Sequence, residues 1–236
     1  MRIAVLADVH GNAAALDAVL EDLAALRPDR ILLNGDLLAF GPEPVETVTL
    51  LRGLDVPSTR GNTDRWLDEV AHERPSASIP EELHGSLRWT IEQLGPGDLR
   101  PLTDLPFALA AHPLAAHLYH ASAAGDEQGV WPDTPAGEIP ALFDAAATPT
   151  CVVSHTHLPG ERTAGELRVL NTGSVGFPYD GDTRACYLVL EGDPGGPIAA
   201  TWRRVGYDRE RALRAIRERG VPMAARLTAR IKSGEF

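Results

Sequence analysis

Seven side chains of the kinds that bind divalent cations occur between residues 8 and 157. They are Asp8, His10, Asp36, Asn62, His120, His155 and His157. Carboxylate, imidazole and amide-oxygen ligands without a thiolate suit Mn, Fe, Ni, Co or Zn, and they fit a structural cysteine–zinc site poorly. Clustered without a compensating cation, the charged members would each lose several kcal/mol on burial. The residue types therefore indicate a metal site.

Seven ligands exceed the number that a protein usually supplies to one metal ion. A pair of ions bridged by one carboxylate accommodates them, and such a pair provides a bridging hydroxide nucleophile and charge stabilisation for in-line attack on phosphorus. We therefore expect two divalent metal ions, with Mn as the first expectation and Fe, Ni, Co or Zn as the alternatives.

The first ligands follow two predicted strands. The apolar run at residues 2–7 reads as a buried strand that ends at Asp8 and His10, whose side chains point the same way if the extended geometry persists. A helical pattern at residues 16–26 and a second apolar strand at residues 30–34 follow, with Asp36 just beyond. In a strand–helix–strand unit the two carboxyl ends share an edge, so we expect Asp36 near the first pair.

The remaining ligands also follow predicted strands. These strands are expected at residues 55–60, 118–122 and 150–153. Open α/β sheets bind ligands at the edge formed by the carboxyl ends of their parallel strands. Helices are expected within residues 66–105, between residues 138 and 146, and from 208 to 220, while the segments after residue 166 read as antiparallel hairpins.

Composition narrows the class of protein. The 236 residues carry 33 acidic and 22 basic side chains, for a formal charge of −11, which argues against a nucleic-acid surface or an anionic membrane as partner. No apolar run approaches the roughly 20 residues that span a bilayer, and no signal segment is recognised, so we expect a cytoplasmic protein. Cys151 and Cys186 lie in apolar runs and are expected to be buried free thiols. Residues 1–236 read as one domain.

The sequence resembles the calcineurin-like metallophosphoesterases, in particular their small bacterial and archaeal phosphodiesterase branch. The resemblance rests on five blocks in the family's order, from residue 8 to residue 157: Asp8-Val9-His10, Gly35-Asp36, Gly61-Asn62, His120 and Ser154-His155-Thr156-His157. It implies a four-layer αββα sandwich of two mixed β-sheets with helices outside. It also implies one metal ion on Asp8, His10, Asp36 and His157, and a second on Asp36, Asn62, His120 and His155.

Two positions depart from the family pattern. The histidine that many relatives place after the asparagine ligand, and that is thought to protonate the leaving group, is Thr63 here. Threonine is too weak an acid for that role, and general acid catalysis contributes about 100-fold to 10,000-fold, so substrates with good leaving groups are expected. Ser154 replaces the usual glycine before His155; its hydroxyl either hydrogen-bonds nearby or fills space, and we favour the second interpretation.

Four further residues are candidates for supporting roles. Asp64 is interpreted as a group that orients its neighbours in the catalytic centre. Asn12 is a helix cap with phosphate contact as a second possibility. Arg65 is a candidate phosphate contact or a surface charge, and Ser174 either forms a turn or contacts phosphate.

These observations lead to one hypothesis and its alternatives. The resemblance implies a dinuclear metal-dependent phosphoesterase that acts on a small phosphate ester, and Thr63 favours a phosphodiesterase. The alternatives are a phosphatase or dinucleoside polyphosphate hydrolase of the same fold, or a non-catalytic scaffold. A homo-oligomer is compatible with the resemblance.

Overall fold

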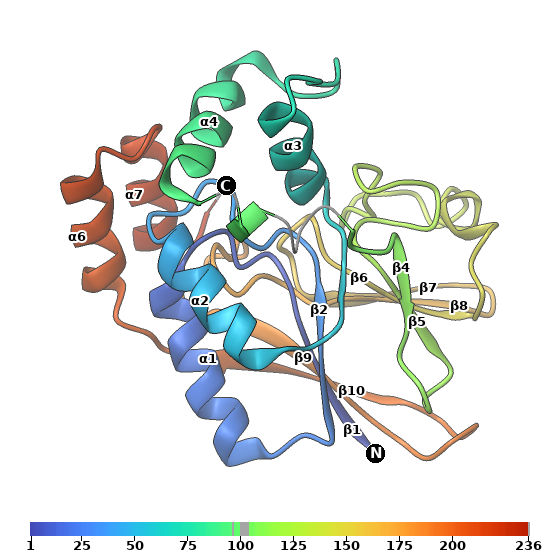
Figure 1. Cartoon of the computed structure of the whole chain (residues 1–236). Helices are drawn as coiled ribbons and strands as arrows, with labels where there is room; N and C mark the ends of the chain where they lie inside the picture. The colour runs from blue at the N-terminus through green and yellow to red at the C-terminus, as the bar shows by residue number, and fades with distance from the viewer. Residues whose placement is uncertain (96, 100–103, 236) are drawn as a thin grey trace.

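Two five-stranded sheets form the centre of the protein (Figure 1). The computed structural model describes residues 1–95, 97–99 and 104–235. The first sheet has the order β10-β9-β1-β2-β3 and the second β4-β5-β6-β8-β7. The first sheet contains β1 (Arg2–Leu6), β2 (Arg30–Asn34), β3 (Ser58–Thr59), β9 (Ala185–Glu191) and β10 (Ala199–Val205). The second contains β4 (Ala108–Ala110), β5 (Ala116–Tyr119), β6 (Thr150–Val153), β7 (Gly160–Ala164) and β8 (Leu167–Asn171).

Both sheets are mixed. In the first, β1, β2 and β3 run parallel, while β9 runs antiparallel to both β1 and β10. In the second, β5, β6 and β8 run parallel, while β4 and β7 are antiparallel edge strands. The parallel strands direct their carboxyl ends to the same edge of their sheet, and this edge carries the candidate ligands.

Helices α1 (Ala13–Leu26) and α2 (Pro44–Leu54) lie beside the first sheet (Figure 1). The other described helices are α3 (Asn62–Ala71), α4 (His84–Gln93), α6 (Arg209–Arg219) and α7 (Ala224–Ser233), with the 3-10 helices η1 (Glu81–Leu83) and η2 (Pro140–Phe143). Asn12 caps α1 by accepting a hydrogen bond from the Ala15 amide, and Asp208 caps α6 in the same way. No helix among the described residues is long and apolar enough to cross a bilayer.

Three of the four buried apolar clusters among the described residues pack against the sheets. Leu6 and Leu33 on one face of the first sheet pack with side chains of α1, α2 and α4. On its other face Val5 packs with Leu118 and Val152 of the second sheet, so a continuous core lies between the sheets. The far face of the second sheet is covered by the segment that contains Phe143 and η2. The expected α/β fold of two mixed sheets is thereby confirmed.

Several expected elements differ in extent. The helix predicted between residues 138 and 146 is only the short η2, because Ile139 and Phe143 alone bury apolar side chains there and one turn is marginal without more packing. The third strand is reduced to two residues, Ser58–Thr59. The helical segment at 66–105 is interrupted between α3 and α4, where Pro75 and Pro80 occur, and its residues 96 and 100–103 lie outside the described part.

The carboxyl-terminal region combines confirmed and missed elements. The hairpin of β9 and β10 and the helix α6 are confirmed, with Asp208 and Gly220 at the ends of α6. The strand β8 is not confined to a hairpin, because Val169 and Leu170 bury opposite faces and β8 lies between β6 and β7. Helix α7 was missed. Cys151 and Cys186 are buried free thiols, as predicted.

Candidate metal centre

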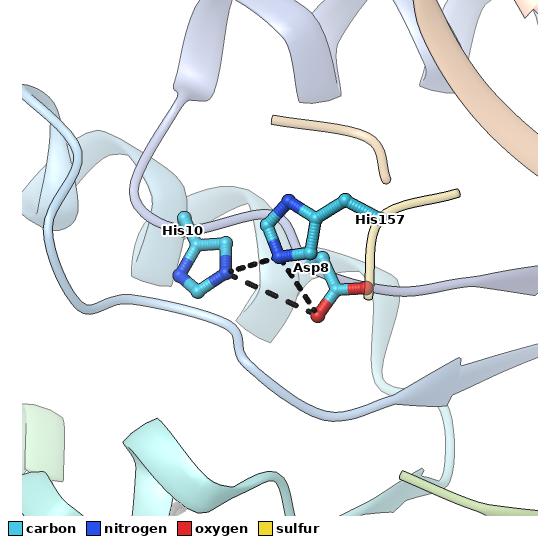
Figure 2. A group of neighbouring side chains, drawn as sticks. All are labelled: Asp8, His10 and His157. Atoms are coloured by element: carbon cyan, nitrogen blue, oxygen red, sulfur yellow. Dashed lines mark hydrogen bonds and ion pairs between the residues drawn. The ribbon is translucent and has the colours of Figure 1, made fainter. Parts of the chain in front are cut away.

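One group of candidate ligands joins residues from the two sheets (Figure 2). Asp8 and His10 follow β1, and His157 follows β6. The Asp8 Oδ1 atom lies 3.9 Å from His10 Nε2 and 3.6 Å from His157 Nε2. The two imidazole Nε2 atoms lie 3.2 Å apart. Three ligand atoms therefore converge on one point in a buried part of the molecule.

The outer nitrogens of the imidazole rings contact main-chain carbonyl oxygens. His10 Nδ1 lies 3.1 Å from the Ala39 oxygen, and His157 Nδ1 lies 2.6 Å from the Phe177 oxygen. A carbonyl only accepts hydrogen bonds, so each Nδ1 carries a proton and each neutral ring directs the Nε2 lone pair inward. Two facing lone pairs cannot form a hydrogen bond with each other. A cation between them satisfies both, which is the usual arrangement of metal-binding histidines.

A second group lies beside the first. It contains Asp8, Asp36 and His120, with Asp36 Oδ2 3.4 Å from His120 Nε2 and 3.6 Å from His10 Nε2. Asp36 therefore lies between imidazoles of the two groups. Both carboxylates are close enough to serve two ions, which is consistent with a bridging role for Asp36 and gives Asp8 access to both groups.

Asn62 connects the second group to His155. Its Oδ1 atom is 3.1 Å from His120 Nε2 and 3.0 Å from His155 Nδ1. His120 Nδ1 lies 2.8 Å from the Asn34 carbonyl oxygen, so its Nε2 is also directed toward the centre. The structure thus brings all seven predicted ligand residues together, including Asn62 and His155, which were assigned to a metal through the resemblance.

The electrostatics of the cluster attract positive charge. Burial disfavours the His120 imidazolium, but the Asp36 carboxylate, the Asp8 carboxylate and the Asn34 carbonyl together outweigh burial and raise the pKa of His120 to about 10. Burial raises the pKa of the Asp8 carboxyl well above its ordinary value. Burial lowers the pKa of His10 and, more strongly, of His157, and together with the His120 charge it lowers the pKa of His155 to about 4. The lowered pKa values keep His10, His155 and His157 in the neutral form that binds a metal ion, whereas a metal ion would displace the proton that the carboxylates hold on His120.

One atom provides a direct test of this fit. Asp8 Oδ1 is buried and has no hydrogen-bond partner among the described residues. An unsatisfied carboxylate oxygen is costly in a protein interior unless a cation compensates it. Its position between His10 and His157 matches a ligand atom, so the donor set fits a divalent metal ion.

The backbone at the ligands is left-handed. The φ angles are 52° at Asp8, 48° at His10, 56° at Asp36, 68° at His155 and 60° at His157. Such angles cost of order 1–3 kcal/mol each in most residues and cluster at functional sites. The extended geometry on which the alignment of Asp8 with His10 depended does not persist, because β1 ends at Leu6, and left-handed residues bring the two side chains together instead.

Asp64 holds the left-handed turn at Asp36 against the start of α3. Its carboxylate accepts hydrogen bonds from the amides of Asp36 (2.8 Å), Leu37 (2.9 Å) and Gly61 (2.9 Å). Burial, followed by the Asp36 charge, raises its pKa to about 6. A Cβ atom on Gly61 would lie 2.1 Å from Asp36 Oδ1, so the loops after β2 and β3 approach as closely as glycine permits. Asp64 thus joins the loop that carries Asp36 to the loop that carries Gly61.

The Ser154 hydroxyl does more than fill space. It accepts a hydrogen bond from Asn34 Nδ2 (3.1 Å) and lies within donating distance of the main-chain oxygens of His120 (3.0 Å) and Asn34 (3.1 Å). It is also 3.2 Å from His120 Nδ1. Of the two interpretations of Ser154, the structure shows hydrogen bonding and not the favoured space filling, because the hydroxyl joins the ends of β2, β5 and β6 behind the His120 ring.

Three residues considered for substrate contact are used elsewhere. Asn12 is buried and its amide donates to the Gly176 carbonyl. The Ser174 hydroxyl donates to the Asp8 carbonyl and accepts from the Phe177 amide. Arg65 forms ion pairs with Glu69, Asp126 and Glu127 and does not line the pocket beside the ligands. The structure thus shows Asn12 as a cap and Ser174 in a turn, while Arg65 is a partly buried group held by three carboxylates and not a solvated surface charge.

A pocket of about 310 Å³ opens beside the ligands. His10, Asp36, Asn62, His155 and His157 form its floor. Its walls consist of Phe40, Thr63, Trp66, Pro80, Glu82, Leu83, Trp131, Phe177, Tyr179, Met223, Arg226 and Arg230. Thr63 was identified by its place next to Asn62, whereas the wall residues of α7, Arg226 and Arg230, lie about 70 residues beyond the last candidate ligand and no spacing in the sequence links them to it.

Comparisons with known proteins agree with this geometry. The model of the calcineurin-like phosphoesterase superfamily domain matches residues 1–194. An uncharacterized protein of Methanocaldococcus jannaschii is 25% identical over 207 residues, which cover 80% of this chain and 82% of that protein. A metallophosphoesterase from Sphaerobacter thermophilus superposes with a TM-score of 0.80 at 30% identity over 99% of both chains. A hypothetical protein from Pyrococcus horikoshii shares the fold, with a TM-score of 0.83 at 22% identity over 99% of this chain and 98% of its own.

Proposed function

Because this chain belongs to the calcineurin-like phosphoesterase superfamily, we propose that it is a metal-dependent phosphodiesterase with a dinuclear centre. The observation that carries the proposal is the buried, partnerless Asp8 Oδ1 atom between two inward-facing imidazoles, at the floor of an open pocket. Divalent ions at this centre would lower the pKa of water and stabilise negative charge on phosphate oxygens.

The chain's own residues divide the work of holding these ions. Asp8, His10, Asp36 and His157 would hold one ion. Asp36, Asn62, His120 and His155 would hold the other. The main-chain carbonyls behind His10, His120 and His157 fix which ring nitrogen faces the centre.

Thr63 favours a diester over a monoester. Its Oγ1 atom is buried, has no partner among the described residues and lies in a residue that lines the pocket. The hydroxyl can donate a hydrogen bond to a substrate oxygen but cannot supply a proton as histidine does. The histidines of this pocket are all candidate ligands, so substrates whose leaving group departs without a protonated side chain are favoured. A diester also carries two organic substituents on its phosphate, and the aromatic walls of the pocket can contact them.

The test compares two chromogenic esters. Metal-stripped protein is supplied with Mn, Ni, Co, Zn or Mg singly, and hydrolysis of bis(p-nitrophenyl) phosphate is measured against p-nitrophenyl phosphate. We expect metal-dependent turnover with higher kcat/KM for the diester. A higher value for the monoester would indicate a phosphatase, and bound metal without turnover of either ester would favour a scaffold.

Asp36→Asn tests the bridging carboxylate. Asparagine keeps the size and the oxygen that accepts the Thr63 amide hydrogen bond (2.9 Å), but it removes the charge. We expect loss of one of two bound metal ions and loss of about 100-fold or more in kcat, in line with other changes at catalytic metal ligands and their partners. The control is Asp193→Asn, the same chemical change in an exposed turn. Full activity of Asp36→Asn would refute the assignment.

A further inference from the structure

Two arginines from α7, Arg226 and Arg230, line the same pocket as the candidate ligands. Tyr179 stacks on the ring of His157, with centroids 4.3 Å apart and planes inclined by 8°. The Cζ atom of Arg230 lies 4.9 Å from the centroid of the Tyr179 ring. Arg230 is therefore separated from a candidate metal ligand by the thickness of one ring, and Arg226, one helical turn earlier, lines the same pocket.

This arrangement gives the pocket a second electropositive region. Outside the candidate ligands, the charged residues among its described walls are Glu82, Arg226 and Arg230, a net charge of +1. The whole chain has a formal charge of −11, so paired arginines inside a pocket contrast with the rest of the molecule. Arg226 is exposed and Arg230 is half-buried, which leaves both within reach of a ligand in the pocket.

The phosphate at the metal ligands would be neutralised there by the ions. Guanidinium groups beyond Tyr179 therefore match a different group of the substrate. Arginine binds phosphate oxygens through paired N–H donors, and two guanidinium charges match the two negative charges of a terminal phosphate better than the single charge of a carboxylate.

We propose that Arg226 and Arg230 bind a second phosphate group, so that the preferred substrate is a phosphodiester that also carries a terminal phosphate. The aromatic side chains of Phe40, Trp66 and Trp131 would contact the organic part between the two phosphates. This inference rests on the proposed phosphodiesterase function, and it adds the substrate class that the same pocket selects.

The experiment uses a matched pair of substrates. Thymidine 5′-(4-nitrophenyl phosphate) and its 3′-phosphorylated counterpart share a leaving group and differ only in the second phosphate. For the metal-loaded protein we expect kcat/KM to be about tenfold higher for the phosphorylated compound, the value of one hydrogen-bonded charge pair of roughly 1.5 kcal/mol. We expect the difference to appear mainly in KM.

Two variants and a control assign the preference to α7. In Arg226→Gln and in Arg230→Gln, the ratio of kcat/KM for the phosphorylated compound to that for the unphosphorylated one should fall toward one. Lys232→Gln removes a charge from the same helix outside this pocket and should keep the ratio of the parent protein. Arg226 is exposed, so its variant tests the inference even if Arg230→Gln folds poorly. Equal kcat/KM values for the two compounds in the parent protein, or an unchanged preference in Arg226→Gln, would overturn the inference.

A binding measurement separates this inference from the proposed function. Calorimetry with metal-loaded protein compares thymidine 3′,5′-bisphosphate with thymidine 5′-phosphate, and we expect about tenfold tighter binding of the bisphosphate, lost in Arg226→Gln. If both nitrophenyl compounds resist hydrolysis but the bisphosphate still binds more tightly, the phosphodiesterase proposal fails and the arginine site stands. Turnover of both compounds with no preference, in kinetics and in binding, refutes the site alone.

Discussion

Removal of the Ser154 hydroxyl tests the polar network behind the metal centre. In Ser154→Ala, Asn34 Nδ2 loses one of its two acceptors and keeps only the Tyr119 carbonyl at 3.0 Å. The Asn34 Oδ1 atom still accepts from the Thr59 hydroxyl at 2.7 Å, so the side chain cannot turn to find another partner without breaking that bond. A buried donor left without a partner costs about 1–3 kcal/mol, and we expect a loss of that size in the free energy of unfolding.

The chain offers a matched control for this change. Ser86 is also buried, but its hydroxyl has no hydrogen-bond partner among the described residues. Ser86→Ala removes the same atom without orphaning a donor, so the free energy of unfolding should stay within about 0.5 kcal/mol of the parent value or rise slightly. The measurement is urea unfolding of chelator-treated proteins, compared at equal m-values.

The metal affinity provides a second readout. The Ser154 hydroxyl contacts both the Nδ1 atom and the main-chain oxygen of His120, so its loss should loosen that ring. Changes to groups that orient metal ligands typically cost about 10-fold to 100-fold in metal affinity, and we expect a loss in this range for Ser154→Ala alone. Equal stability and equal metal affinity of the two alanine variants would refute the network argument and restore the space-filling interpretation.

Three further predictions use other parts of the structure. Gly61→Ala should abolish metal binding measured by calorimetry, because the added Cβ would lie 2.1 Å from the Asp36 carboxylate. The control is Gly53→Ala, whose Cβ would meet open space and which should stabilise α2 by up to about 1 kcal/mol in thermal unfolding. Asp22→Asn should cost about 0.5–1 kcal/mol at pH 7. The hydrogen bond from Arg203 lowers the pKa of Asp22. The stabilisation by the Asp22 carboxylate is therefore present above the unfolded pKa of about 4 and is lost as the pH falls through the folded pKa. An equal loss of unfolding free energy at about pH 7 and about pH 2.5, measured by urea unfolding, would contradict this. Thr63→His should raise kcat for alkyl diesters by about 100-fold but leave p-nitrophenyl esters nearly unchanged; a uniform increase would exclude a general-acid effect.

The grouping of the candidate ligands at one edge of the sheets follows from short-range patterns in the sequence. Asp8 and Asp36 follow consecutive apolar strands joined by a helix, and parallel strands must end at a common edge. The ends of α6 at Asp208 and Gly220 were likewise predicted from the sequence, because a helix end depends on its immediate neighbours in the chain. Such features are encoded within a few residues.

The tertiary structure alone decided how the ligands are aimed and what surrounds them. Left-handed turns, not strand alternation, direct Asp8 and His10, because the opposing loops restrict the backbone. The Ser154 hydroxyl found its partners on Asn34 and His120, 120 and 34 residues away. The stack from His157 through Tyr179 to Arg230 joins three separate segments. Such contacts follow from the packing of distant segments, and packing leaves no periodic trace in the sequence.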